Sequence, residues 1–247
     1  MYLKYHLKKT ILLSLFFLCR SLYSQQDSLI KVNGNVLITN NGIDPVPAFA
    51  LGKPAIMTNL FIRKGHFIYN GQLNYSLDFK PWAVNNWFLW RIPLNEKSYI
   101  RTGGALSFFH KRDRIDYLTR KNTDIQITNQ YVTSELSYWY KLSSNSNVQL
   151  IYWQDFGLQW DGLKYGSFIS ASANFNNIPL INALRLNLNP NFFYLNNTEP
   201  QRGLFFSQIT SLSVSPIPLN AFIQIVIPIH VLPKSDLIWN FGLMYKF

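Results

Sequence analysis

The sequence is poor in several features that stabilise or anchor many proteins. Cys19 is the single cysteine among 247 residues, which excludes an intrachain disulfide and any metal site built from several thiolates. No apolar run near the N-terminus exceeds residues 11–18, far short of the roughly 20 residues that a membrane-spanning helix needs. Charged residues are only 14% of the chain and aromatic residues are 16%. This balance argues against a water-facing β-sandwich and favours a wall with lipid on one side and a confined aqueous lumen on the other.

The first 24 residues have the organisation of a secretory signal peptide. Three lysines precede the apolar run, and Ser24 supplies a small residue at the expected cleavage point. We predict a signal peptide at 1–24 and one mature domain at 25–247, without cysteine. A retained membrane anchor is the alternative.

The positive charge of the chain predicts its surroundings. Of the 23 basic residues four lie in the signal peptide, which leaves 19 against 12 acidic ones and a mature net charge of +7. Lipopolysaccharide is rich in phosphate, so outer-membrane lipids and lipopolysaccharide are the expected partners, and nucleic acid is not. Five basic residues in the segment 111–121 predict either a lipopolysaccharide-contacting loop or an ordinary solvated one.

Segments with period-two alternation predict an all-β transmembrane antiparallel barrel. A Lys64-Gly65 turn is expected to join the second and third strands. Twelve strands give the even number that such barrels use, and ten strands, with the N-terminal segment as a plug, are the alternative. The expected strands are 31–40, 55–63, 66–79, 86–94, 98–110, 126–142, 148–158, 165–175, 182–194, 203–214, 220–231 and 237–247.

The last strand identifies the class of barrel. Apolar or aromatic residues occupy every second position from Leu237, and the chain ends on Tyr245, Lys246 and Phe247. Such an ending resembles the assembly signal of small Gram-negative outer-membrane barrels, including porin-like ones. The resemblance implies residence in the cell outer membrane, with Tyr245 and Phe247 recognised by the outer-membrane assembly machinery. It covers the architecture of the mature chain and does not specify a substrate.

Connection lengths predict the orientation. Short links at 64–65, 95–97, 143–147, 176–181 and 215–219 belong in the periplasm, and the alternate connections, including a long loop at 111–125, belong outside. The stretch 42–54 is too apolar for a free loop, so it is expected to fold against the rim or into the lumen. Interfacial aromatic girdles are expected from Trp82, Trp87 and Trp160 at the outer ends and Tyr140, Tyr245 and Phe247 at the inner ends.

Catalytic, cofactor and metal sites are not expected. Enzymatic barrels carry a His-x-Ser pair on one strand face, because a serine nucleophile needs a base within hydrogen-bond reach. None of His66, His110 and His230 has serine two residues on. A lipid hydrolase is therefore the third hypothesis, behind a passive or narrow channel for small polar solutes and a non-conducting structural or surface-interaction barrel.

A row of charges in the lumen is the predicted functional feature. A short turn at 95–97 places Arg91 opposite Arg101, and the turn at 143–147 places Glu135 opposite Asp155. Closing the long loop with His110 near Gln126 then brings Arg101 beside Glu135. The row Arg91, Arg101, Glu135, Asp155 would either fill and stabilise a narrow interior or set a transverse field at a constriction.

Overall fold

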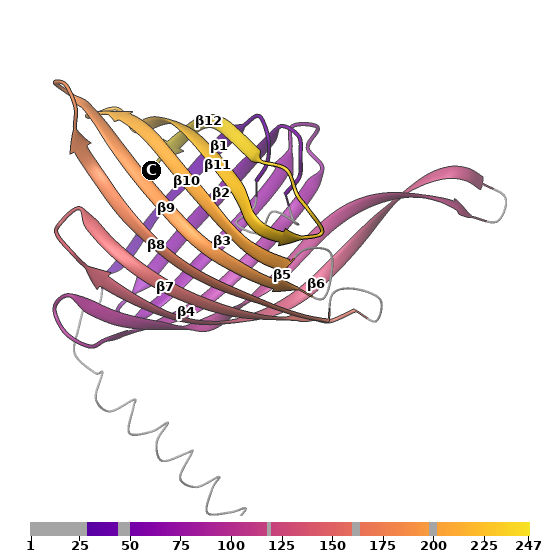
Figure 1. Cartoon of the computed structure of the whole chain (residues 1–247), viewed down its shortest axis with the longest axis horizontal. Coiled ribbons are helices and arrows are strands. Elements are labelled where there is room, and N and C mark those ends of the chain that lie inside the picture. The colour runs from indigo at the N-terminus through magenta and orange to yellow at the C-terminus, as the bar shows by residue number, and fades with distance from the viewer. Residues whose placement is uncertain (1–28, 44–49, 118–119, 160–163, 198–201) are drawn as a thin grey trace, which may run out of the picture.

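The computed structural model describes residues 29–43, 50–117, 120–159, 164–197 and 202–247, and these form a closed antiparallel barrel (Figure 1). Twelve strands are confirmed, and the ten-stranded alternative is wrong. The predicted signal peptide lies outside the described residues. The strands are β1 (Ile30–Thr39), β2 (Ala55–Lys64), β3 (Phe67–Ser76), β4 (Pro81–Pro93), β5 (Ser98–Tyr117), β6 (Arg120–Lys141), β7 (Ser146–Gly157), β8 (Tyr165–Pro179), β9 (Leu184–Asn197), β10 (Arg202–Val214), β11 (Leu219–Leu232) and β12 (Ile238–Lys246).

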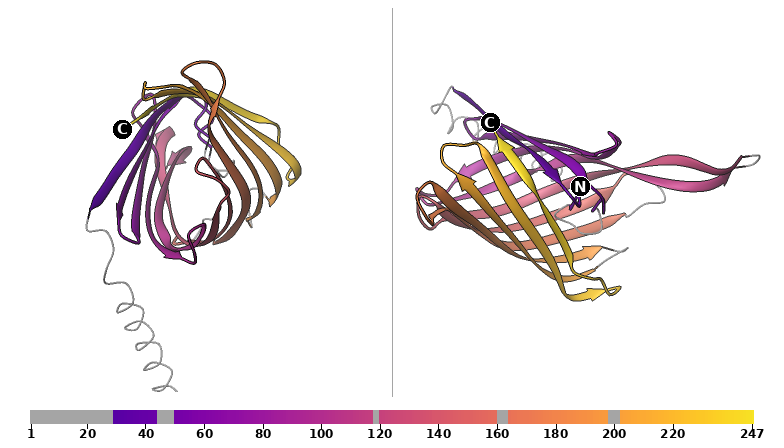
Figure 2. Two further views of the ribbon diagram at one scale, coloured as in Figure 1. Left: turned by 90° about the vertical axis from the view of Figure 1, so that its left-hand side faces the viewer. Right: turned by 90° about the horizontal axis from the view of Figure 1, so that it is seen from above.

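Each strand pairs with its neighbours in sequence, and β1 pairs with β12 to close the ring (Figures 1 and 2). Side chains alternate between the two surfaces of the wall. On β12, Trp239 and Leu243 are each 50% exposed on the outer face, whereas Asn240 is 2% exposed and points inward. In the described part of the chain no helix is long and apolar enough to cross a bilayer.

The connections at one end of the barrel, which we call the turn end, are all four residues or shorter. They comprise residues 65–66, 94–97, 142–145, 180–183 and 215–218. The C-terminus lies at the same end, and the opposite end is the loop end. The rule that short turns lie inside predicts that the turn end faces the periplasm.

The first hairpin turn differs from the prediction by one residue. It consists of Gly65 and His66, so Lys64 pairs with Phe67 and the predicted Lys64-Gly65 turn is wrong. Gly65 has a φ of 56°, a conformation that glycine adopts without steric cost. Every opposed pair is shifted by two residues from the predicted register, and an even shift keeps each side chain on its predicted face.

The predicted loop at 111–125 is instead a continuous two-stranded ribbon. β5 pairs with β6 from Ser98↔Tyr140 to Tyr117↔Arg120, and the ribbon projects beyond the barrel wall (Figures 1 and 2). The predicted basic contacts of this segment lie mainly outside the described side chains. Backbone pairing across the whole hairpin satisfies the donors and acceptors that a free loop would leave to water.

The C-terminal residue closes the barrel. The backbone N–H of Phe247 donates to Gly34 O at 3.0 Å, and Gly34 N–H donates to Phe247 O at 2.9 Å. A Cβ at position 34 would lie 2.6 Å from the Phe247 ring, so glycine provides the space for that ring. Phe247 and Tyr245 both lie on the exposed outer face, and the closing seam contains five Cα pairs between Asn35 and Thr39 of β1.

Two of the predicted girdle tryptophans lie inside the barrel. Trp82 is 4% exposed and packs with Ala55 and Ala83, and Trp87 is 9% exposed and packs with Leu89 and Ala105. Trp82 falls at a register shift between β3 and β4, which the alternation pattern alone does not reveal. Trp160 lies outside the described residues.

Candidate functional site

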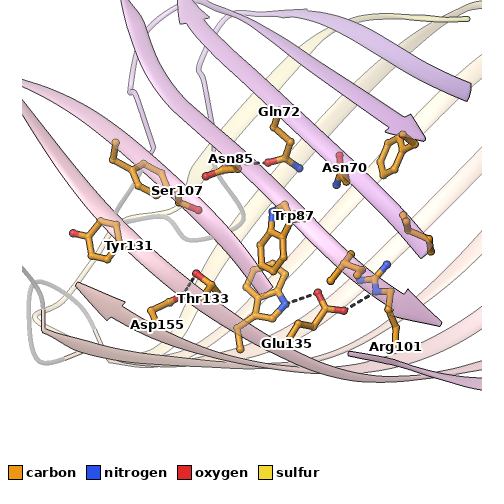
Figure 3. Close-up of a pocket in the computed structure, with 15 residues that line it drawn as sticks. Asn70, Gln72, Asn85, Trp87, Arg101, Ser107, Tyr131, Thr133, Glu135 and Asp155 are labelled. Carbon is orange, nitrogen blue, oxygen red and sulfur yellow. Dashed lines mark hydrogen bonds and ion pairs between the residues drawn. The ribbon is translucent and has the colours of Figure 1, made fainter. Parts of the chain in front are cut away.

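A cavity of about 230 Å³ with both polar and apolar walls lies inside the barrel against the wall formed by β2 to β7 (Figure 3). We call it the polar cavity, after the amides, hydroxyls and charges in its lining. Its walls come from the inward positions of six consecutive strands, which is why residues distant in sequence meet there. The lining combines amides, hydroxyls, charges and aromatic rings: Phe61, Ile68, Asn70, Gln72, Asn85, Trp87, Leu89, Arg101, Ser107, Phe109, Tyr131, Thr133, Glu135, Trp153 and Asp155.

Arg101 and Glu135 form an ion pair in the part of this cavity that lies nearer the turn end. Arg101 Nε donates to Glu135 Oε1 at 2.6 Å. Glu135 also accepts from Ser137 Oγ at 2.8 Å and from Trp153 Nε1 at 2.9 Å. The Glu135 side chain is 1% exposed and that of Arg101 is 18% exposed, so the carboxylate is desolvated and depends on these three donors.

The backbone of the neighbouring strand requires glycine at position 103. Gly103 lies directly opposite Glu135 and has a φ of 151°. A Cβ there would lie 2.1 Å from the carbonyl oxygen of Phe88. Glu135 turns diagonally towards Arg101, two residues nearer the turn end.

Arg91 lies opposite Arg101 in the β4–β5 register, as predicted from the short turn between these strands. Both guanidinium groups rest on aromatic rings, with Arg91 Cζ 4.0 Å from the Tyr99 centroid and Arg101 Cζ 4.8 Å from that of Trp139. Those two rings stack on one another at 5.6 Å. Aromatic faces attract cations, so the two rings partly offset the repulsion between the arginines.

Asp155 does not belong to the predicted row, and this part of the prediction is wrong. Glu135 lies opposite Trp153, and Asp155 lies opposite Thr133, nearer the loop end. Thr133 Oγ1 donates to Asp155 Oδ1 at 2.5 Å. The β6–β7 turn is the cause, because Ser146 O accepts from Leu142 N–H and the hairpin closes one residue earlier on each strand than predicted. Asp155 and Arg101 therefore lie at different levels of the polar cavity, with Arg101 nearer the turn end.

Sequence reasoning missed the partners that surround these charges. Ser137 and Trp139 follow Glu135 at intervals of two residues on β6 and therefore face the same side. Trp139 Nε1 donates to Ser137 Oγ at 3.0 Å, which aims the serine hydroxyl at Glu135. Period-two spacing from Glu135 was the signal that could have found them.

Aromatic side chains fill the other half of the lumen. Trp87 contacts Trp153 with ring centroids 4.9 Å apart, although their strands are separated by β5 and β6. The row continues through Phe168 and Phe193 to Phe205, with successive centroids 4.7, 5.5 and 5.0 Å apart. The interior is thus bridged from β4 to β10, and the polar cavity is left along one wall.

The connection between β1 and β2 folds into this apolar region. Ile43 is 3% exposed and packs with Phe168, Phe193 and Phe205 on the facing strands. Gly42 N–H donates to Lys53 O at 2.9 Å, and Leu51 N–H donates to Gly42 O at 2.7 Å. The predicted inward folding of 42–54 is therefore observed at Ile43, while residues 44–49 lie outside the described residues.

At the loop end, the segment that leads into β2 makes an ion pair with the connection between β3 and β4. Lys53 Nζ lies 3.7 Å from Asp78 Oδ1, and Lys80 Nζ lies 2.7 Å from Asp78 Oδ2. The hydrogen bond from Lys80, and next the one from Ser76, hold the pKa of Asp78 well below its ordinary value. The carboxylate therefore stays charged throughout the neutral and mildly acidic range.

The structure does not pair Ser76 with His66, or Ser107 with His110, as a serine nucleophile and its base would require. Ser76 and His66 lie at opposite ends of the β3 hairpin arm. His110 lies three residues after Ser107 on β5 and faces the other side, where its Nδ1 is 2.9 Å from Thr128 Oγ1. Within the described residues no group of three His, Cys, Asp or Glu side chains could hold a metal ion.

Solved structures with the same architecture are outer-membrane proteins. The chain is similar to the KdgM porin, with a TM-score of 0.50 and 10% identity over 87% of this chain and 99% of that one. The chain folds as an outer-membrane β-barrel. The β domain of the Bordetella autotransporter Brka (TM-score 0.47, 9% identity, 88% and 98% covered) and OmpT of Vibrio cholerae (TM-score 0.45, 6% identity, 90% and 99% covered) are also similar. No family model and no curated protein sequence matches the chain.

Proposed function

We propose that this outer-membrane barrel is a narrow, passive channel for small polar solutes. The observation that carries the proposal is the polar cavity along β2 to β7, which extends from Asp155 and Tyr131 near the loop end to Arg101 near the turn end. Ala105 lies four positions after Arg101 and is level with Thr133 and Asp155. At 3.3 Å per residue the two charged levels are about 13 Å apart along the wall.

The aromatic row would set the width of the passage. Trp87 and Trp153 both border the cavity, and Trp153 also packs against the apolar cluster that contains Ile43. Apolar constrictions in pores restrict flow by excluding water. A solute would therefore pass between this aromatic edge and the polar wall, where amides and hydroxyls can replace part of its hydration shell.

Conductance of the refolded barrel in planar bilayers tests this proposal. The wild type should give small, reproducible conductance steps, and Trp87→Ala should enlarge them at least twofold because it removes the indole that borders the cavity. Trp90→Ala is the matched control, because Trp90 is three residues away on the same strand but 44% exposed on the outer face. Its conductance should equal that of the wild type.

A non-conducting structural barrel is the second candidate, and the bridged lumen with Ile43 in its apolar cluster favours it. In that case neither the wild type nor Trp87→Ala would conduct, although both would be folded. Conductance that rises equally in Trp87→Ala and Trp90→Ala would also contradict the channel proposal, since it would reflect leakage around a perturbed barrel.

A further inference from the structure

Positive charge is concentrated in the lumen at the turn end. By strand alternation the inward positions there carry several basic residues, and Glu96 and Glu135 are the acidic residues of that half among the described ones. Asp78, Asp155 and Asp236 lie towards the loop end. The inward basic residues of the turn half are Lys31, Arg63, Arg91, Arg101, Lys141, Arg185 and Lys246.

Three of these residues are close together. Lys31 and Arg63 are directly opposed in the β1–β2 register, which brings their Cβ atoms to about 5 Å. Arg63 Nε donates to Gly65 O at 3.0 Å, and the backbone N–H of Arg91 donates to the next carbonyl of the same turn, His66 O, at 2.8 Å. The two arginines are thus held against one turn, near enough for their charges to repel.

These three cations are not neutralised by the protein. Arg101 is paired with Glu135, but within the described residues Lys31, Arg63 and Arg91 make no ion pair with a carboxylate. The Nε of Arg91 is buried and has no acceptor in the part of the chain that the structure describes. A buried guanidinium donor without an acceptor lowers the stability of the fold. An oxyanion from outside the protein would supply the missing acceptor.

We propose that Lys31, Arg63 and Arg91 form a binding site for a soluble anion that carries two or more carboxylate or phosphate groups. Tyr99 covers one flat face of the Arg91 guanidinium, so an anion would have to approach the guanidinium along its edge. That edge is a planar fork of donors that matches carboxylate and phosphate oxygens. Lys31 is exposed at the turn end, so an anion can reach the site from that side of the membrane whether or not the lumen conducts.

Calorimetric titration of the purified, folded barrel in a non-ionic detergent at low salt tests the site, with citrate and inorganic phosphate as probes. The wild type should bind citrate saturably, and Arg91→Gln should weaken that binding at least tenfold. Lys64→Gln is the matched control. It removes the same charge one residue from Arg63 but on the outer face, so it should bind citrate as the wild type does.

If Arg91→Gln does not fold, Lys31→Gln and Arg63→Gln test the site instead. Each should weaken citrate binding at least threefold. Absence of saturable binding in the wild type, unchanged binding in the site variants, or an equal loss in Lys64→Gln would each overturn the proposal. The readout needs no ion flow, so a barrel that binds citrate without conducting would refute the channel and retain the anion site.

Discussion

At the scale of single residues, the ion pair in the lumen is asymmetric. Glu135 is enclosed and accepts three hydrogen bonds, whereas Arg101 is partly exposed and also rests on Trp139. A carboxylate that loses its cation here stays desolvated, but an arginine that loses its anion can still reach water. The two partners therefore contribute differently to stability.

We expect Arg101→Ala to lower the free energy of unfolding by about 3 kcal/mol, because it strands a buried charge. Glu135→Gln should cost less, since the amide oxygen can still accept from Ser137 or Trp153. The double variant should recover part of the loss seen in Arg101→Ala. Urea unfolding in detergent, followed by tryptophan fluorescence, measures all three, and purely additive effects would show that the two side chains are not coupled.

At the scale of elements, the predicted faces are correct and the predicted registers are partly wrong. The patterns of β3 and β12 assign Asn70, Gln72 and Asn240 to the lumen, as observed. Register depends on how each hairpin closes. The turn at 65–66 begins one residue later than the predicted link 64–65, and the turn at 142–145 begins one residue earlier than the predicted link 143–147. Alternation has a period of two and cannot detect such shifts, because they move opposed pairs by two residues and preserve the faces.

Uncertainty in strand register also explains which residues of the candidate site can be predicted from the sequence. Arg91 and Arg101 were placed opposite one another because the turn that joins their strands is short. Asp155 was misplaced because its partner depended on a serine-rich turn with several possible closures. The crossing of the lumen by Trp87 and Trp153 depends on the curvature of the closed wall, which no local pattern encodes.

The C-terminal strand gives a prediction at this scale. Deleting Tyr245 to Phe247 removes the proposed assembly signal together with both hydrogen bonds between Phe247 and Gly34. The amount of assembled barrel should fall at least fivefold, measured by quantitative immunoblotting of outer-membrane fractions. Deleting three residues from the tip of the β5–β6 ribbon is the control and should leave assembly intact, and unchanged assembly of the C-terminal deletion would contradict the prediction.

At the scale of the whole molecule, the apolar side chains form a belt around the barrel. Outward residues such as Phe88, Leu136, Leu150, Ile169 and Phe192 are each more than half exposed. Exposure of this much apolar surface is unfavourable in water and favourable against lipid tails. The strands pair around the whole ring from β1 to β12, as a sheet that spans a membrane requires.

The intact protein should therefore fractionate with the outer membrane and migrate differently on gels before and after boiling. Folded barrels resist detergent because every backbone group of the wall is paired, and heating converts them to the unfolded mobility. Trypsin treatment of the unboiled sample provides a second measure of folding. Recovery of folded protein from the soluble periplasmic fraction would contradict the membrane assignment.

The burial of Ile43 also constrains how the barrel can form. Its partner Phe168 follows it by 125 residues, and Val226 follows by 183. Contacts of such large sequence separation are slow to form, because the entropy of the intervening chain is lost before the contact stabilises the fold. Ile43 can be buried only after β8 to β11, which carry most of its partners, have formed. Filling of the interior therefore belongs to the last stage of folding, and no partial barrel built from the first half of the chain can acquire the native apolar cluster.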